Sequence, residues 1–426
     1  MARCDIEAST IFPIPAVPVM KQPTIFFVDD EQNVLDGLRR VLRRKVRDWD
    51  LHFFLSADEA LQKMEEMPVD AIVTDMRMPH MDGATFMKEV ATRFPDTIRF
   101  ILSGYADSES LGRALSYTHQ FFAKPWDADV FVQLISQTLK QKELTIDDNI
   151  RPFITKLGSL PSLPSLYQEL RKCIDDQGSL SDATKIVSKD VAMTAKILQM
   201  MNSAFFGFSQ QITSISQAIT LLGLDNLCSI VLSSQVFQPY KSKKGVDQEV
   251  LTEIIEHSLL TARLAQKFTL DETRNRALAN EAFSAGLLHD IGKTVLLVQL
   301  PEVFQQVQLR AAEQIVPFHE AETELYHVTH AEVGGYLLGV WGLPQTLIDA
   351  VIFHHLPLRS DSVRYTIPGI VSMASLIATY RRPYTSGEIT EEYWQQSTQD
   401  LTPELLARWT SIADDVLASL DETVGV

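Results

Sequence analysis

The 426-residue chain has few cysteines, no long apolar run and no excess of basic residues. Its three cysteines, Cys4, Cys173 and Cys228, have neither the number nor the spacing of a disulfide framework or a thiolate metal site. No run of about 18 apolar residues could span a bilayer. The net charge of −17 disfavours direct binding to nucleic acid. We therefore expect a cytoplasmic protein that contacts neither membrane nor nucleic acid.

The length argues for two or three domains, since one domain typically takes about 150 residues. The only apolar stretch near the start carries Pro13, Pro15 and Pro18, which argues against a signal peptide. We expect a disordered tail over residues 1–22.

Between residues 23 and 145, short apolar runs alternate with segments of helical periodicity. This alternation predicts an α/β domain with a doubly wound, five-stranded parallel sheet and helices on both faces. The ligand-binding atoms should then lie in the loops after the strands. The predicted strands are residues 24–28, 51–55, 71–74, 98–102 and 120–123.

Acidic residues follow two of these strands. Asp29 and Asp30 come directly after the first, and Asp75 follows the third. Three carboxylates in one crevice repel each other unless a cation or a proton intervenes. Mg²⁺ takes oxygen ligands and can hold a phosphoryl donor, which leaves Asp75 as the nucleophile.

A hydroxyl and a cation follow two other strands. Attack of Asp75 on phosphorus would create an acyl phosphate, whose added charge calls for a hydroxyl donor and a fixed cation. Ser103 and Lys124 would supply them. Pro125 should keep the loop around Lys124 extended.

The segments VDDE, VTDMRMPHMDG, ILSGYAD and FFAKPW resemble the receiver domain of response regulators over the whole predicted domain. The resemblance implies a flavodoxin-like fold, bound Mg²⁺ and phosphoryl transfer from a sensor histidine kinase. By this resemblance the site residues are Asp75 as phosphoacceptor, Asp30 as direct Mg²⁺ ligand, Asp29 as a ligand through water, the backbone carbonyl of Arg77 as a further ligand, and Ser103 with Phe121 as the switch pair.

Residues 146–426 show apolar residues at three-and-four spacing and predict an all-α domain. Within it, seven of the ten histidines fall between positions 257 and 355. His289 and Asp290 offer adjacent ligands on a predicted helix, and other histidines could close a site for one or two divalent ions. The predicted helices are 166–174, 182–201, 216–237, 250–268, 281–300 and 403–422. The candidate ligands are His257, His289, Asp290, His330, His354 and His355.

This part resembles the HDOD domains, which are related to the HD superfamily of metal-dependent phosphohydrolases. The stretches LPSLPSLYQEL, SKDVAMTAKILQMMNSAFFG and ITSISQAITLLGLDNL, with HDIGK and HAEVGGYLL, carry the resemblance. The candidate ligands also match metal positions of the HD-GYP phosphodiesterases, and Lys293 matches a phosphate position. However, Ser375 stands where a late carboxylate is expected, and no GYP signature follows His355. Asp349, Asp361 or Glu324 could substitute if the fold brings one close.

The sequence thus predicts a two-component response regulator in which phosphorylation of Asp75 switches an HDOD output domain. Two output classes stay open, a protein-interaction module and a metal-dependent phosphodiesterase acting on a cyclic dinucleotide. We favour the first because of Ser375 and the absent signature. The expected partners are a histidine kinase and an unknown downstream protein, with a homodimer as a candidate assembly.

Overall fold

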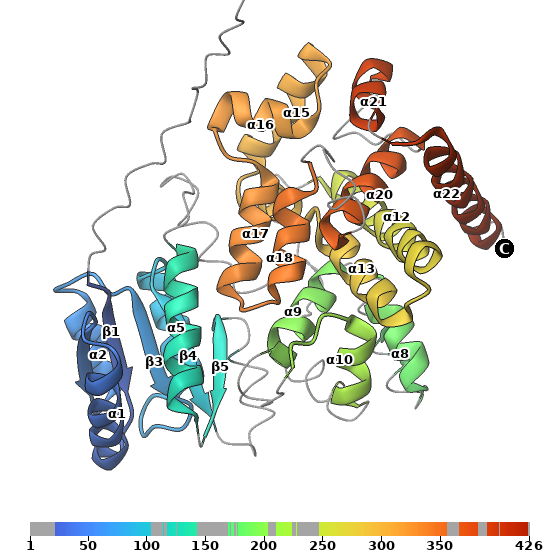
Figure 1. The fold of residues 1–426 in the computed structure, drawn as a ribbon. Coiled ribbons are helices and arrows are strands. Elements are labelled where there is room, and N and C mark those ends of the chain that lie inside the picture. Colours follow the sequence, from blue (N-terminus) through green and yellow to red (C-terminus); the bar gives the residue numbers. More distant parts are fainter. Residues whose placement is uncertain are drawn as a thin grey trace, which may run out of the picture.

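The computed structural model describes residues 22–103, 117–124, 126–142, 178–202, 210–223, 247–355, 366–381, 390–399 and 401–424, with a few isolated positions between them. The chain forms a sheet-containing part and a helical part (Figure 1). The predicted tail at 1–22 lies almost wholly outside the described residues, and so does the predicted domain boundary near 145.

The first part is built on a parallel sheet with the strand order β2-β1-β3-β4-β5. Three of its strands are buried along their whole length, as expected of a parallel sheet that is covered on both faces. The order reverses between β1 and β3, and such a switch point is where open α/β sheets bind ligands. The strands are β1 (Thr24–Val28), β2 (Asp50–Phe54), β3 (Ala71–Asp75), β4 (Ile98–Ser103) and β5 (Gln120–Ala123).

Helices cover both faces of this sheet (Figure 1). Helix α1 (Gln32–Lys45) buries Leu35, Leu38 and Leu42 in one core, which it shares with α5 (Ala128–Lys142). Helices α2 (Ala57–Met64) and α3 (Gly83–Arg93) belong to the core on the opposite face. The predicted doubly wound α/β fold is confirmed.

The second part is helical throughout its described residues, which confirms the predicted all-α class. No helix of the described chain has the length and apolar character needed to cross a bilayer. Its helices are α8 (Leu180–Val187), α9 (Val191–Asn202), α10 (Ile215–Leu222), α12 (Gln248–Thr273), α13 (Arg276–Leu288), α14 (Ile291–Gln299), α15 (Pro301–Gln314), α16 (Phe318–Tyr326), α17 (His330–Val340), α18 (Gln345–Phe353), α20 (Ile367–Arg381), α21 (Glu391–Thr398) and α22 (Pro403–Val424).

Two of the predicted long helices are each divided into two. The predicted helix 182–201 breaks before α9, where the Asp190 side chain accepts a hydrogen bond from the Met193 amide. The predicted helix 281–300 breaks at His289 and Asp290, between α13 and α14. Apolar periodicity continues through both breaks because the helices on either side are buried. The sequence pattern therefore does not reveal the change of direction.

The two parts of the chain are in direct contact. Helix α17 packs against α5, and α9 packs against β5. Figure 1 shows α17 and α9 on the side of the helical part that faces the sheet. The β5 edge of the sheet therefore lies next to the helical part.

Candidate functional sites

The first candidate site lies at the carboxyl edge of the sheet. We define the acidic pocket by Asp29, Asp75 and Lys124. The Lys124 ammonium lies 2.9 Å from a carboxylate oxygen of Asp29 and 2.5 Å from one of Asp75. Asp29 and Asp75 are buried, whereas Asp30 is exposed. The fold thus brings together residues that are 46 and 49 positions apart in sequence.

Strand register explains this convergence. Asp75 ends β3 beside Leu102, and Ser103 ends β4 beside Ala123. The Lys124 amide donates to the Ser103 carbonyl at 2.9 Å, which holds Lys124 at the same edge. Parallel strands place their carboxyl ends together, so the spacing of the strands sets the spacing of the site.

The backbone of Arg77 and that of Gly83 lie close to Asp75. The Arg77 amide donates to the second Asp75 carboxylate oxygen at 2.7 Å. A Cβ atom at Gly83 would lie 2.3 Å from the Asp75 carbonyl oxygen, so only glycine fits there. Ser103 and Phe121, the predicted switch pair, are both buried, and Phe121 packs within the core shared with the helical part.

The electrostatics of the acidic pocket favour a charged Lys124. Burial alone lowers the pKa of Lys124, but its hydrogen bonds to Asp75 and Asp29 outweigh burial and raise that pKa above its ordinary value. The ammonium is therefore a fixed positive charge beside the predicted phosphoacceptor.

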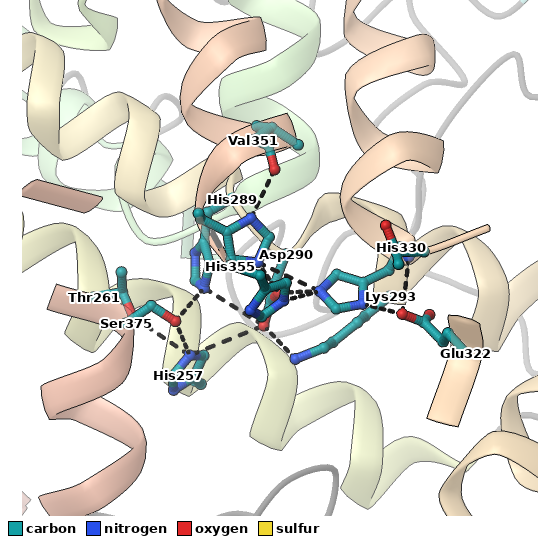
Figure 2. A network of polar contacts seen from close by, with 12 residues as sticks. His257, Thr261, His289, Asp290, Lys293, Glu322, His330, Val351, His355 and Ser375 are labelled. Atoms are coloured by element: carbon teal, nitrogen blue, oxygen red, sulfur yellow. Dashed lines mark hydrogen bonds and ion pairs between the residues drawn. The ribbon is translucent and has the colours of Figure 1, made fainter. Parts of the chain in front are cut away.

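The second candidate site is a buried group of histidines around one aspartate (Figure 2). The His cluster consists of His257, His289, Asp290, His330, His354 and His355. Two groups in it have ligand atoms close enough to hold a metal ion, and both groups include Asp290. The first is Asp290 with His330, His354 and His355, and the second is Asp290 with His257 and His289.

The imidazoles converge through the same ring atom. The Nε2 atoms of His330 and His354 lie 3.2 Å and 3.5 Å from Asp290 Oδ1. Those of His289 and His257 lie 3.5 Å and 3.9 Å from Oδ2. Each carboxylate oxygen thus faces a separate pair of imidazoles.

The opposite ring nitrogens are held by the protein. Nδ1 of His289 lies 2.7 Å from the Gly286 carbonyl, and Nδ1 of His354 lies 2.6 Å from the Val351 carbonyl. Nδ1 of His330 lies 2.6 Å from a Glu322 carboxylate oxygen. Metal-binding histidines characteristically donate their other ring N–H to a carbonyl or a carboxylate, because this fixes the tautomer and orients the ring.

Most of these imidazoles are neutral near pH 7. Burial lowers the pKa of His257 to about 3, and it holds the pKa values of His289 and His355 well below their ordinary value. For His330, burial also acts to lower the pKa, but the Glu322 charge reverses the effect and the pKa is raised. Neutral imidazole is the form that binds metal.

Ser375 lies inside the His cluster. Its Oγ is 3.2 Å from His289 Nε2 and 3.3 Å from His257 Nε2. Lys293 lies on the same side of Asp290, with its ammonium 2.9 Å from Oδ2. The hydroxyl of Ser375 therefore occupies the position at which the sequence suggested that a carboxylate was missing.

None of the suggested substitute carboxylates enters the described cluster. Asp349 accepts a hydrogen bond from Gln345 on the surface, and Glu324 pairs with Arg310. Asp361 lies outside the described residues.

Two relevant side chains were missed by sequence reasoning. They are Glu322, which supports His330, and His319, whose ring stacks on His355 at 3.9 Å between centroids.

Comparisons with known proteins agree with this architecture. Residues 25–136 match the family model of the response regulator receiver domain, and residues 160–357 match that of the HDOD domain. Together the two models match well over half of the chain.

Among curated relatives, an uncharacterized protein of Treponema pallidum (strain Nichols) is 29% identical over 346 residues, which is 76% of this chain and 66% of that protein. The hydrogenase transcriptional regulatory protein HoxA of Cupriavidus necator is 36% identical over 129 residues, 30% of this chain and 26% of HoxA. The chain thus spans about two thirds of the first relative and about a quarter of the second.

Among solved structures, the MmoQ response regulator of Methylococcus capsulatus str. Bath is 23% identical, with 59% of this chain and 98% of that chain covered and a TM-score of 0.47. The signal receiver domain of an HD domain-containing protein of Pseudomonas fluorescens Pf-5 is 26% identical, with 30% and 96% covered and a TM-score of 0.29. On the strength of the two family matches and the sheet and helices described above, the chain is a response regulator that contains a receiver domain followed by an HDOD domain.

Proposed function

We propose that a histidine kinase transfers a phosphoryl group to Asp75 and that this modification switches the HDOD domain. The observation that carries the proposal is the position of Lys124, within 2.9 Å of both Asp29 and Asp75. A carboxylate oxygen of Asp75 forms a bond to phosphorus while the P–N bond to the kinase phosphohistidine breaks, and the histidine leaves as imidazole and takes up a proton. The Lys124 ammonium neutralises charge on the phosphoryl oxygens. Ser103 ends the neighbouring strand, and its hydroxyl would donate a hydrogen bond to the same group.

The donor set fits Mg²⁺. Asp29 and Asp75 present carboxylate oxygens to one point, where a single ammonium already contacts both, and Asp30 stands exposed beside them. Asp29, Asp30, Asp75 and the carbonyl of Arg77 would hold the ion. When bound, it would neutralise these carboxylates and bind the oxygens of the phosphoryl donor.

Labelling with acetyl phosphate tests this proposal. We expect wild type to be phosphorylated and Asp75→Asn to be unlabelled, because the amide is not a nucleophile. Lys124→Ala should still be labelled but should lose the change in the HDOD domain. Equal labelling of wild type and Asp75→Asn would refute the assignment.

The contact between the domains offers a route for the signal. Gln120, next to Phe121 on β5, donates from Nε2 to the Val340 carbonyl at the end of α17 (3.2 Å) and to Thr138 Oγ1 on α5 (2.7 Å). Helix α17 begins at His330, which belongs to the His cluster. A rearrangement around Phe121 would therefore reach the His cluster through one helix.

A second contact lies on α9. Gln199 donates to the His119 carbonyl at 2.6 Å, and Lys196 donates to the Gln199 side chain at 2.9 Å. The Lys196 ammonium also lies 4.1 Å from the Trp341 ring centroid. We propose that these buried polar contacts set the geometry in which the receiver rests on the HDOD domain, which acts as a protein-interaction module.

A metal-dependent phosphodiesterase is the second candidate for the HDOD domain. It is favoured by the convergence of imidazole Nε2 atoms on Asp290, which is the donor set of divalent metal ions. Ions held there by His257, His289, Asp290, His330, His354 and His355 would make hydroxide available near neutral pH. Lys293 would bind a phosphate oxygen. Ser375 argues against this candidate, because a neutral hydroxyl stabilises a dication less than a carboxylate does.

Metal analysis and an activity assay separate the two candidates. Purified wild type, His289→Ala and Asp290→Ala would be compared for bound divalent metal and for hydrolysis of cyclic dinucleotides. Tightly held metal with hydrolysis that both substitutions abolish would establish the phosphodiesterase. Metal without hydrolysis would favour the interaction module.

A further inference from the structure

A cavity of about 840 Å³ lies among α8, α10, α12 and α13, four helices that lie together in Figure 1. We define it as the Arg263 pocket. It is separate from the His cluster, since none of the cluster residues lines it. Its volume is in the range of pockets that bind small organic ligands.

The pocket combines polar and apolar walls. Leu180, Leu259 and Phe283 supply partly buried apolar surface. Gln266 and Asn280 place side-chain amides in the lining, where Gln266 Nε2 donates to Asn280 Oδ1 at 3.0 Å. Each amide retains further hydrogen-bonding capacity after that bond. The walls can therefore hold a planar or apolar body and hydrogen-bond its edge.

The charges in the lining are not equivalent. Lys185 pairs with Asp182 at 3.3 Å, and Lys189 pairs with Glu169 at 3.6 Å, both in exposed positions. Arg263 is half-buried, and no carboxylate of the described chain forms an ion pair with it. Burial lowers the pKa of Arg263, and no acidic neighbour opposes this effect. A guanidinium in such a position gains from an anionic partner, because it presents a planar fork that matches carboxylate and phosphate.

We propose that the Arg263 pocket binds a small organic anion whose phosphate or carboxylate group pairs with Arg263 and whose body packs against Phe283 and Leu259. Such a ligand would contact α12 and α13, the two helices that also carry His257 and lead into His289. The proposal does not depend on phosphorylation of Asp75 or on metal in the His cluster.

Calorimetric titration of the full chain tests this site with three probes. Guanosine 5′-monophosphate carries a phosphate on a planar body, benzoate carries a carboxylate on one, and guanosine carries neither anion. We expect one or both anions to bind and guanosine to bind at least tenfold more weakly. The anion that binds distinguishes phosphate from carboxylate as the recognised group.

Variants assign the binding to Arg263. Arg263→Gln should weaken binding by about 10- to 100-fold, the loss expected for a charge-assisted hydrogen bond. Arg276→Gln, which removes an exposed arginine at the start of α13, should bind as wild type does. Phe283→Leu gives a second test, because it removes the aromatic face and keeps the wall apolar.

Asp290→Ala separates this site from the His cluster. Binding that persists in Asp290→Ala and falls in both Arg263→Gln and Phe283→Leu supports the proposal, whatever the outcome at the His cluster. The proposal is overturned if neither anion binds at millimolar concentration. It is also overturned if Arg263→Gln binds as tightly as wild type, or if Asp290→Ala alone abolishes binding.

Discussion

In three imidazoles of the His cluster, the two ring nitrogens have different partners. His289, His330 and His354 each direct Nδ1 to a carbonyl or a carboxylate and Nε2 to Asp290. Glu322 differs from the two carbonyls because it brings a negative charge to His330. It also accepts a hydrogen bond from the His330 amide at 3.0 Å. Glu322 thus fixes both the ring and the start of α17.

Glu322→Gln should weaken metal binding by about 10- to 100-fold, the effect usual for an outer partner of a ligand histidine. The amide keeps the shape but removes the charge that raises the pKa of His330. Titration with Mn²⁺ or Zn²⁺ measures the change. Glu324→Gln is the matched control, since Glu324 lies on the same helix but is exposed. Equal losses in the two variants would contradict this role of Glu322.

At the scale of the elements, α14 and α17 approach each other closely beside Asp290. A Cβ atom at Gly292 would lie 1.9 Å from the His330 carbonyl oxygen, and one at Gly334 would meet Ile291 and Val351 side chains at 2.9 Å. The contact at Gly292 is with backbone, which cannot move aside as a flexible side chain can. The short distance between the two helices therefore sets the distance from Asp290 to His330.

Gly292→Ala should destabilise the folded chain by about 1–3 kcal/mol and weaken metal binding, because the methyl group forces α14 away from α17. Gly37→Ala on α1 is the control. Its Cβ would have no neighbour within 4 Å, and alanine should stabilise a helix by up to about 1 kcal/mol. Urea denaturation of both variants gives the comparison. An unchanged midpoint for Gly292→Ala would show that the helices separate without cost.

The elements also show what the sequence could predict. The five apolar runs gave each strand to within one residue at either end, because polar or turn residues bound each run. The helix break at His289 and Asp290 was missed, because Leu288 and Ile291 are both buried and the periodicity continues between them. The sequence pattern does not predict the role of Glu322, since its contact with His330 depends on the turn between α16 and α17.

At the scale of the whole molecule, the receiver and HDOD domains share a buried polar interface. Gln120 bonds to α17, and a Cβ atom at Gly342 would meet the Gln120 side chain at 2.9 Å. The Gln120 side chain therefore lies against both the end of α17 and Gly342. It lies one residue from Phe121, so the resting contact and the predicted switch occupy adjacent positions.

Gln120→Ala should uncouple the domains, because it removes the bonds to Val340 and Thr138. Hydrogen exchange of α17 would be followed before and after treatment with acetyl phosphate. We expect phosphorylation to change exchange in wild type and to have little effect in Gln120→Ala, although Asp75 is labelled in both. Gln133→Ala, at an exposed position of α5, should respond as wild type does. A full response in Gln120→Ala would exclude this route.

Lys196 makes the stability of the folded chain depend on pH. Burial, with the nearby Arg99 charge, lowers its pKa from 10.5 to about 7. Between these two values the unfolded chain binds more protons at Lys196 than the folded chain does, so the cost of burying this group falls and the folded chain gains stability as pH rises from 7 toward 10.5. Lys196→Met should flatten that rise in urea midpoints between pH 7 and 9. A parallel rise in both proteins would show that Lys196 is charged in the folded state.

Asp290 belongs to both groups of potential ligands, so two ions would draw on a single negative charge. An ion bound by His330, His354 and His355 would leave the other position with two neutral imidazoles, a serine hydroxyl and a carboxylate already partly neutralised. The two metal positions would therefore fill in steps, and the first ion would bind tightly and the second weakly. Such a protein would hold one ion through purification and gain the second only when the surrounding metal is plentiful.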